Sequence, residues 1–141
     1  REPMRFNPAN RGAWYAALGI ETCIAEVGHH LTLALADVGD FNAVVEYGEM
    51  LASMSGVFVD LRDLADHPAL DPDPSTGYAE GNAVAARARA DGHNGVIYPS
   101  VRHTGGTCVA ALWPNVVQSV VQGAMVRLTW SGNPEYVWEP I

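Results

Sequence analysis

The stretch from Arg5 to His30 reads RFNPANRGAWYAALGIETCIAEVGHH, and we expect the rest of the chain to be organised around it. It places two arginines, three aromatic residues, two glutamates and two histidines within twenty-six residues. Residues 13–18 are apolar and aromatic and are followed by Gly19, which predicts a short buried strand. This strand would carry Trp14 and Tyr15 into the interior.

A helix is predicted directly after this strand. From Ile20 to about Leu35, apolar side chains recur at steps of three and four residues, as on the buried face of an amphipathic helix. Gly28 disfavours the second half, because glycine weakens a helix interior, so an end near His30 is the alternative.

Length and composition describe one globular domain over residues 1–141. The chain has 48% hydrophobic residues, 17% charged residues and a net charge of −8, with no lysine. Binding to nucleic acid or anionic membrane needs clustered positive charge, so both are disfavoured. Two distant cysteines, Cys23 and Cys108, favour reduced thiols in the cytoplasm, and a single disulfide stays open.

Neither a membrane span nor a signal peptide is predicted. No apolar run approaches the roughly 18 residues that a bilayer span needs. The chain begins with Arg1-Glu-Pro instead of methionine, so we expect that preceding residues are missing.

The later elements predict an α+β fold with antiparallel or mixed sheets, since regular strand–helix alternation is absent. A turn at residues 53–56 separates the first two later strands, and an exposed proline-rich loop covers residues 66–74. We expect a hairpin turn at Gly105-Gly106 between the strands at 95–100 and 107–113, and a second late hairpin from the strands at 126–130 and 136–139. Strands are expected at residues 41–47, 57–59, 95–100, 107–113, 126–130 and 136–139, and helices at 60–65 and 78–90.

Arg5, Tyr15, Glu26 and Ser100 form the candidate set of greatest chemical interest. Arginine matches phosphate oxygens, tyrosine offers a face to a flat ring, and a carboxylate stabilises an oxocarbenium-like cation. Taken singly, each has an ordinary structural role: Arg5 and Glu26 on the surface, Tyr15 in the core, and Ser100 at a strand end.

Three other candidate sites carry weaker signals. Glu26 and His29 have the spacing of a carboxylate-bridged metal helix, but no second copy is present, so no metal is expected. Cys23 or Cys108 as a nucleophile lacks a recognisable motif, and an inert thiol is favoured. Gly105-Gly106 with the neighbouring Arg102 and His103 could cradle phosphate, although a hairpin turn is favoured.

The sequence resembles the RES domain family, which is named for an arginine, a glutamate and a serine. The resemblance rests on the ordered spacing of motifs over most of the chain. These motifs are Arg5-Phe-Asn, Ala13-Trp-Tyr-Ala-Ala17, Glu21-Thr-Cys-Ile-Ala-Glu-Val27 with His29-His30, Gly95-Val-Ile-Tyr-Pro-Ser-Val-Arg102 and Cys108-Val-Ala-Ala-Leu112.

The resemblance implies a fold like that of ADP-ribosyltransferases, with NAD bound as substrate in a cleft between small sheets flanked by helices. Arg5, Glu26 and Ser100 would be the family residues, with Arg11 close enough to compete with Arg5. Arg5 would hold the diphosphate, and Tyr15 would pack on the nicotinamide or its ribose. Ser100 would bind nearby, and Glu26 would stabilise the developing cation.

Arg102, which follows in the serine motif, is added to the expected NAD-binding residues. The implied function is a cytoplasmic toxin of a toxin–antitoxin pair that cleaves the nicotinamide–ribose bond. Water, phosphate or a protein side chain would accept the ADP-ribose. The implied partner is an antitoxin with a helix-turn-helix domain, and the alternative is a module that binds a nucleotide or a partner without turnover.

Overall fold

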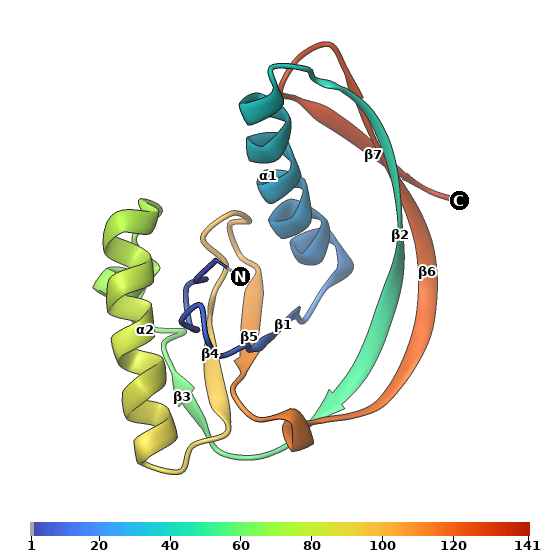
Figure 1. The fold of residues 1–141 in the computed structure, drawn as a ribbon. Coiled ribbons are helices and arrows are strands. Elements are labelled where there is room, and N and C mark those ends of the chain that lie inside the picture. The colour runs from blue at the N-terminus through green and yellow to red at the C-terminus, as the bar shows by residue number, and fades with distance from the viewer. Residues whose placement is uncertain (1) are drawn as a thin grey trace.

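The structure is a computed structural model and describes residues 2–141. Figure 1 shows a small sheet beside the second helix and long curved strands on the far side of the first helix. In chain order the elements are β1 (Trp14–Ala17), α1 (Ile20–Val38), β2 (Asn42–Met54), β3 (Phe58–Asp60), the 3-10 turn η1 (Pro68–Leu70), α2 (Pro74–Ala90), β4 (Gly95–Pro99), β5 (Thr107–Ala111), the 3-10 turn η2 (Pro114–Val116), β6 (Val117–Ser131) and β7 (Tyr136–Pro140).

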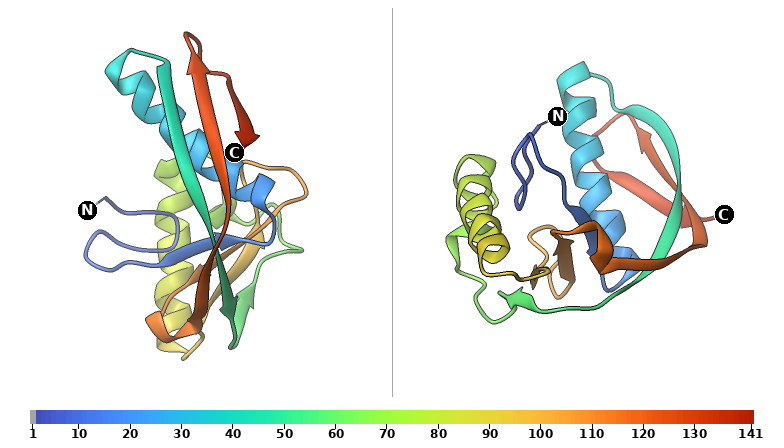
Figure 2. Two further views of the ribbon diagram at one scale, coloured as in Figure 1. Left: turned by 90° about the vertical axis from the view of Figure 1, so that its right-hand side faces the viewer. Right: turned by 60° about the horizontal axis from the view of Figure 1, so that its bottom comes forward.

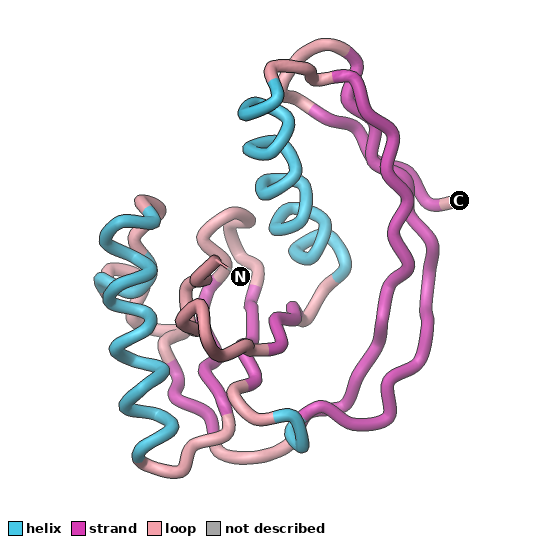
Figure 3. The backbone as a smooth tube through the Cα atoms, in the orientation of Figure 1, coloured by secondary structure: helices cyan, strands magenta, loops and turns pink. Residues whose placement is uncertain are grey.

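The strands form two separate sheets, which confirms the predicted α+β class. One sheet has the order β1-β5-β4-β3 and the other has the order β2-β6-β7. All neighbours pair antiparallel except β3 and β4, which are parallel. Both predicted late hairpins, β4–β5 and β6–β7, are confirmed, and neither sheet closes on itself (Figure 3).

The four-stranded sheet packs against α2 and the N-terminal loop. Phe6 from this loop is fully buried in one hydrophobic cluster with Val96 and Tyr98 of β4, and the Phe6 and Tyr98 rings lie 4.7 Å apart. Figure 2 shows the loop between α2 and β1. The sheet thus fixes the loop that carries Arg5. Trp14 at the start of β1 remains 46% exposed, so the prediction that this strand is buried holds only in part.

Helix α1 packs on the concave side of the three-stranded sheet. Its predicted apolar stripe meets Val126, Leu128 and Trp130 of β6 in a second hydrophobic cluster. The predicted helix to about Leu35 is confirmed and the alternative end near His30 is wrong, since α1 continues to Val38 and is capped by Gly39 in the left-handed conformation. Tyr136 of β7 explains why position 28 is a glycine, because a Cβ at this position would overlap with the tyrosine phenol.

Other predicted boundaries also change. The helix predicted over residues 60–65 does not form: Asp60 ends β3 and residues 61–65 form turns, because the Leu61 amide donates to the carbonyl of Ile97 and Asp60 accepts from the Arg62 amide. Helix α2 begins at Pro74, before the predicted residue 78, with Asp73 accepting from the Ser75 amide as its cap.

Strand β2 extends to Met54, well past the predicted end at residue 47, and includes part of the predicted turn. Along residues 2–141, no helix is both long and apolar enough to cross a membrane.

Candidate functional site

A cavity of about 200 Å³ lies where the N-terminal loop, β1, α1 and the segment after β4 meet. It is smaller than the roughly 300–1,000 Å³ of pockets that enclose a whole drug-sized ligand, so it fits one end of a larger molecule. Four of the predicted residues line it, namely Arg5, Tyr15, Glu26 and Arg102. The full lining is Met4, Arg5, Tyr15, Ala16, Ala17, Cys23, Glu26, Val27, His30, Tyr78, Tyr98, Val101, Arg102 and Cys108.

Arg5 is held rigidly although it is charged. Its Nη1 donates to the carbonyl of Ala69 at 2.7 Å and to that of Asp71 at 2.9 Å, and the residue is only 8% exposed. Its guanidinium carbon lies 5.4 Å from the centre of the Tyr78 ring. Within the described chain its Nε and Nη2 make no hydrogen bond, so both donors remain for a ligand. Burial lowers the pKa of the Arg5 guanidinium below its ordinary value.

Helix α2 approaches Arg5 closely at two glycines. A Cβ at Gly77 would overlap with the Arg5 guanidinium, and a Cβ at Gly81 would overlap with the Arg5 carbonyl oxygen. Asn82, next along the helix, donates to the carbonyl of Met4 at 2.8 Å. The position of Arg5 therefore depends on small residues spaced one turn apart on α2.

Tyr15 supplies an aromatic wall, while its hydroxyl has a structural role. The hydroxyl donates to Oδ1 of Asn7 at 2.8 Å and accepts from the Phe6 amide at 2.9 Å. Burial raises the pKa of Tyr15 to about 12, so the hydroxyl stays protonated. The phenol ties the N-terminal loop to β1 and leaves the ring to line the cavity.

Glu26 and Ser100 meet directly although 74 residues separate them. The Ser100 hydroxyl donates to Oε1 of Glu26 at 2.8 Å and accepts from the amides of Arg102 at 3.2 Å and His103 at 3.0 Å. The two amides occupy the lone pairs of the hydroxyl, which directs its hydrogen toward the carboxylate. Ser100 itself does not line the cavity, so in this structure it orients Glu26.

A second contact anchors the loop that carries Ser100. Thr22, which is 3% exposed and lies one helical turn before Glu26, has its Oγ1 2.8 Å from Nδ1 of His103. Gly106 makes room, because a Cβ there would overlap with Thr22. The Gly105-Gly106 segment is thus the hairpin turn that was favoured, and His103 binds α1.

The two cysteines are free thiols, and both line the cavity. Cys108 is buried, and its Sγ donates to Oε1 of Glu26 across 3.7 Å. Burial and the neighbouring Glu26 raise the pKa of Cys108 to about 12, and burial raises that of Cys23 from 9.0. Both shifts disfavour the thiolate that a nucleophile needs.

The remaining polar groups around the cavity are Arg102 and the two histidines. Arg102 lines the cavity, and its Nη2 lies 3.3 Å from the carbonyl of Pro72. Burial lowers the pKa of His29 and His30 from 6.5, so both are neutral at pH 7. Among residues 2–141, no group of three or more potential ligand side chains is placed to hold a metal ion.

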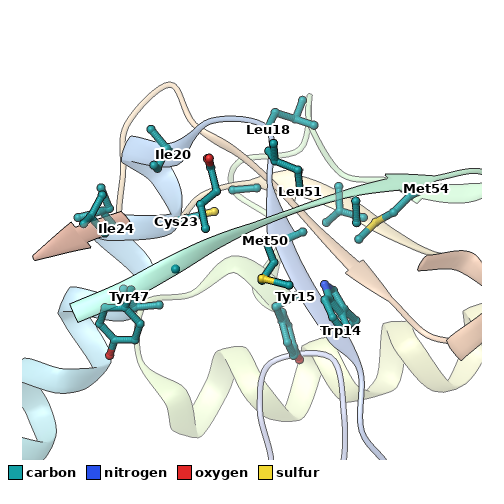
Figure 4. A pocket seen from close by; sticks show the side chains of 18 of the residues that line it. Trp14, Tyr15, Leu18, Ile20, Cys23, Ile24, Tyr47, Met50, Leu51 and Met54 are labelled. Atoms are coloured by element: carbon teal, nitrogen blue, oxygen red, sulfur yellow. The ribbon is translucent and has the colours of Figure 1, made fainter. Parts of the chain in front are cut away.

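A larger hollow of about 650 Å³ lies on the other side of β1, against α1 and β2 (Figure 4). Its labelled side chains are mostly apolar, including Leu18, Met50 and Leu51, which are 72%, 55% and 50% exposed. Tyr15 and Cys23 line both spaces. The hollow lacks the arginines of the smaller cavity, so its chemistry suits an apolar contact.

Comparison with known families identifies the domain that contains this cavity. The profile of the RES domain matches residues 1–131. The chain belongs to the RES domain family. Membership supports a coarse assignment as an NAD-processing, toxin-like domain. No curated protein matches the sequence with significance.

In this RES domain the sequence-predicted set is largely brought together. Arg5, Tyr15, Glu26 and Arg102 share the cavity, and Ser100 contacts Glu26 from outside it. Arg11, the competitor of Arg5, lies elsewhere, with its guanidinium 4.6 Å from the centre of the Trp113 ring.

Sequence reasoning missed Tyr78, Tyr98 and His30 as parts of the cavity wall. For Tyr78 a signal was present, since it follows Gly77 in a helix where a second glycine recurs four residues later.

Proposed function

We propose that this RES domain binds NAD and cleaves its nicotinamide–ribose bond, as the toxin of a toxin–antitoxin pair. One observation carries the proposal. A carboxylate, that of Glu26, is oriented by Ser100 inside a cavity that also presents Arg5 and the Tyr15 ring. In NAD, the diphosphate matches Arg5, the flat nicotinamide ring matches Tyr15, and the cation that develops on the ribose matches Glu26.

Arg5 binds the diphosphate in this mechanism. Its Nη1 is held by two carbonyls, while Nε and Nη2 make no hydrogen bond within the described chain. A guanidinium fixed on one side offers its other donors at little conformational cost. Arg102, on the same cavity wall, adds a second positive charge.

Glu26 acts where the bond breaks. The bond between ribose C1′ and the pyridinium nitrogen breaks with both electrons passing to nitrogen, so nicotinamide leaves as a neutral molecule without a proton. The ribose carbon becomes cationic, and the Glu26 carboxylate stabilises that charge. Ser100 and Cys108 both donate to Oε1, which holds the carboxylate in position.

The acceptor completes the reaction by forming a bond to C1′. Water gives ADP-ribose, phosphate gives its 1″-phosphate, and a protein nucleophile gives an ADP-ribosylated protein. In each case the acceptor loses a proton, which Glu26 or solvent takes. The cavity presents no side chain that selects one of these three.

Measuring nicotinamide release from NAD tests the proposal. Glu26→Gln keeps the size and a hydrogen bond to Ser100 but removes the charge, so release falls by about 10²- to 10³-fold. Glu21→Gln is the matched control, because Glu21 is an exposed carboxylate on the same helix outside the cavity and its loss leaves the rate unchanged.

The products of the reaction identify the acceptor, and one outcome would overturn the proposed enzymatic activity. Free ADP-ribose, its phosphate ester and labelled protein are measured in the same reactions, with and without phosphate and a cell extract. If no condition releases nicotinamide while NAD still binds, the protein is a binding module. Cellular toxicity that survives Glu26→Gln leads to the same conclusion.

The partner in this proposal is an antitoxin with a helix-turn-helix domain, and the site of action is the cytoplasm. The net charge of −8 is consistent with a toxin that leaves DNA contact to its partner. The apolar hollow beside β1 offers surface for such a contact. Co-expression followed by mass measurement of the purified complex tests it, and a toxin that always purifies alone argues against it.

A further inference from the structure

The arginines outside the cavity divide into two kinds. Arg62, Arg87 and Arg127 each form a salt bridge with a carboxylate. Arg11 and Arg89 form none within the described chain, although the sequence has twice as many acidic as basic residues. Burial and the nearby charge of Arg11 lower the pKa of Arg89, so these two guanidinium groups feel each other's charge. Two neighbouring cations without a salt bridge in the described chain form a local positive region.

Arg11 lies in an open hollow of about 930 Å³, separate from the catalytic cavity. Its guanidinium covers the Trp113 ring at 4.6 Å, and the Trp113 Nε1 donates to the carbonyl of His93 at 3.0 Å, which fixes the indole. Trp14 lines both this hollow and the apolar hollow against β2, and with 46% of its surface exposed it offers a second indole. Glu2 lines the hollow too but makes no salt bridge with Arg11 in the described chain.

Arg89 and His93 carry buried side-chain nitrogen atoms without a hydrogen-bond partner in the described chain. These atoms are Nε and Nη2 of Arg89 and Nδ1 of His93. An uncompensated cation away from water attracts an anion more strongly than an exposed one. Arg89 therefore adds to the field at Arg11 without contacting a ligand itself.

We propose that this hollow binds a mononucleotide, with a phosphate on the Arg11 guanidinium and the base against the exposed Trp14 indole. A planar guanidinium matches phosphate oxygens, and an indole stacks on a base of any sequence. The combination of positive charge and aromatic surface selects a ligand with both a phosphate and a flat ring. The hollow shares Met4 and Tyr15 with the catalytic cavity but none of its other lining residues.

Titration calorimetry of the full chain with ADP, adenosine and inorganic phosphate tests the site. ADP binds more tightly than either fragment, because only ADP uses both the charge and the ring. Arg11→Gln weakens ADP binding by about tenfold, and Trp14→Ala weakens ADP but leaves inorganic phosphate unchanged. Trp14 is exposed enough that its variant keeps the fold, which circular dichroism verifies.

Two controls separate this site from its surroundings. Arg87→Gln removes an exposed charge from the helix that also carries Arg89, and it should change ADP affinity by less than about twofold. Arg5→Gln removes the diphosphate contact of the catalytic cavity and lowers only the ADP binding that occurs there, so the ADP binding that depends on Arg11 remains.

The proposal fails if wild-type protein does not bind ADP. It also fails if Arg5→Gln abolishes binding while Arg11→Gln does not, since ADP would then occupy the cavity. An equal loss in Arg87→Gln would show non-specific attraction and would overturn it as well. Nicotinamide release by Arg11→Gln, measured separately, reports on the NAD-cleaving function and stays at the wild-type rate.

Discussion

Replacing Gly81 with alanine tests whether α2 positions Arg5. The new Cβ would lie well under 3.0 Å from the Arg5 carbonyl oxygen, a separation that real Cβ atoms essentially never show, and 3.0 Å from the Arg5 Cγ. A backbone oxygen cannot rotate away as a flexible side chain can. The helix or the N-terminal loop must therefore move before ordinary contact, which begins at 3.4 Å, is restored.

Two opposing terms set the change in stability. Alanine in place of glycine in a helix interior contributes about 1 kcal/mol to folding. Overpacking against a fixed neighbour costs about 1–3 kcal/mol. With a backbone atom as the neighbour, we expect the upper part of that range, so Gly81→Ala loses about 1–2 kcal/mol of unfolding free energy.

The same shift affects activity more than stability. A displacement of about 1 Å in a substrate-binding group lowers the rate by about 10²-fold. Nicotinamide release from NAD should fall by that factor, while urea unfolding monitored by circular dichroism gives the loss of stability.

Ala83→Gly is the control, because Ala83 is exposed on the same helix. It should lose about 1 kcal/mol and keep full activity. A Gly81→Ala protein that is more stable than wild type and fully active would refute the role of this contact.

Three further outcomes follow from the site. Thr22→Val removes the bond to His103 and should lower both nicotinamide release and stability, the latter by about 1–3 kcal/mol, whereas Thr22→Ser keeps the bond and most of the rate. Ser100→Ala removes a donor to Glu26 and should lower kcat more than it raises KM for NAD in steady-state kinetics. The folded pKa of Cys108, about 12, lies above its unfolded value of 9.0, so its contribution to stability is complete below pH 9 and is lost as pH rises toward 12. Unfolding free energy, measured by urea titration at pH 8, 9 and 10, should fall by up to about 1.4 kcal/mol per pH unit above pH 9, and Cys108→Val should flatten that fall.

Local sequence patterns predicted the features of the fold that depend on residues close together in the chain. The stripe from Ile20 to Leu35 appears in the structure as the buried face of α1, because helical periodicity and burial follow from neighbours in sequence. The alternative helix end near His30, which rested on Gly28, was wrong because it ignored a distant contact. Glycine there serves a contact with Tyr136, more than a hundred residues away, and no local pattern shows such a partner.

Glu26 and Ser100 show the same division. Only the family resemblance predicted that these residues belong to one site, since neither is unusual in its own segment, and their hydrogen bond across 74 residues was not predicted. The sequence also could not predict that β2 and β3 belong to different sheets, because β2 pairs with β6, which lies far along the chain. Strand identity depends on local propensity, whereas strand partners depend on the whole fold.

Tyr136 ties the end of the chain to the helix that carries Glu26. Its hydroxyl donates to the carbonyl of Ile24 at 3.3 Å, and its phenol fills the space above Gly28, on either side of Glu26 in the helix. Tyr136 lies beyond residue 131, where the family match ends. The last strand therefore braces the helix that carries Glu26, and shortening it would loosen this helix without altering any residue that lines the cavity.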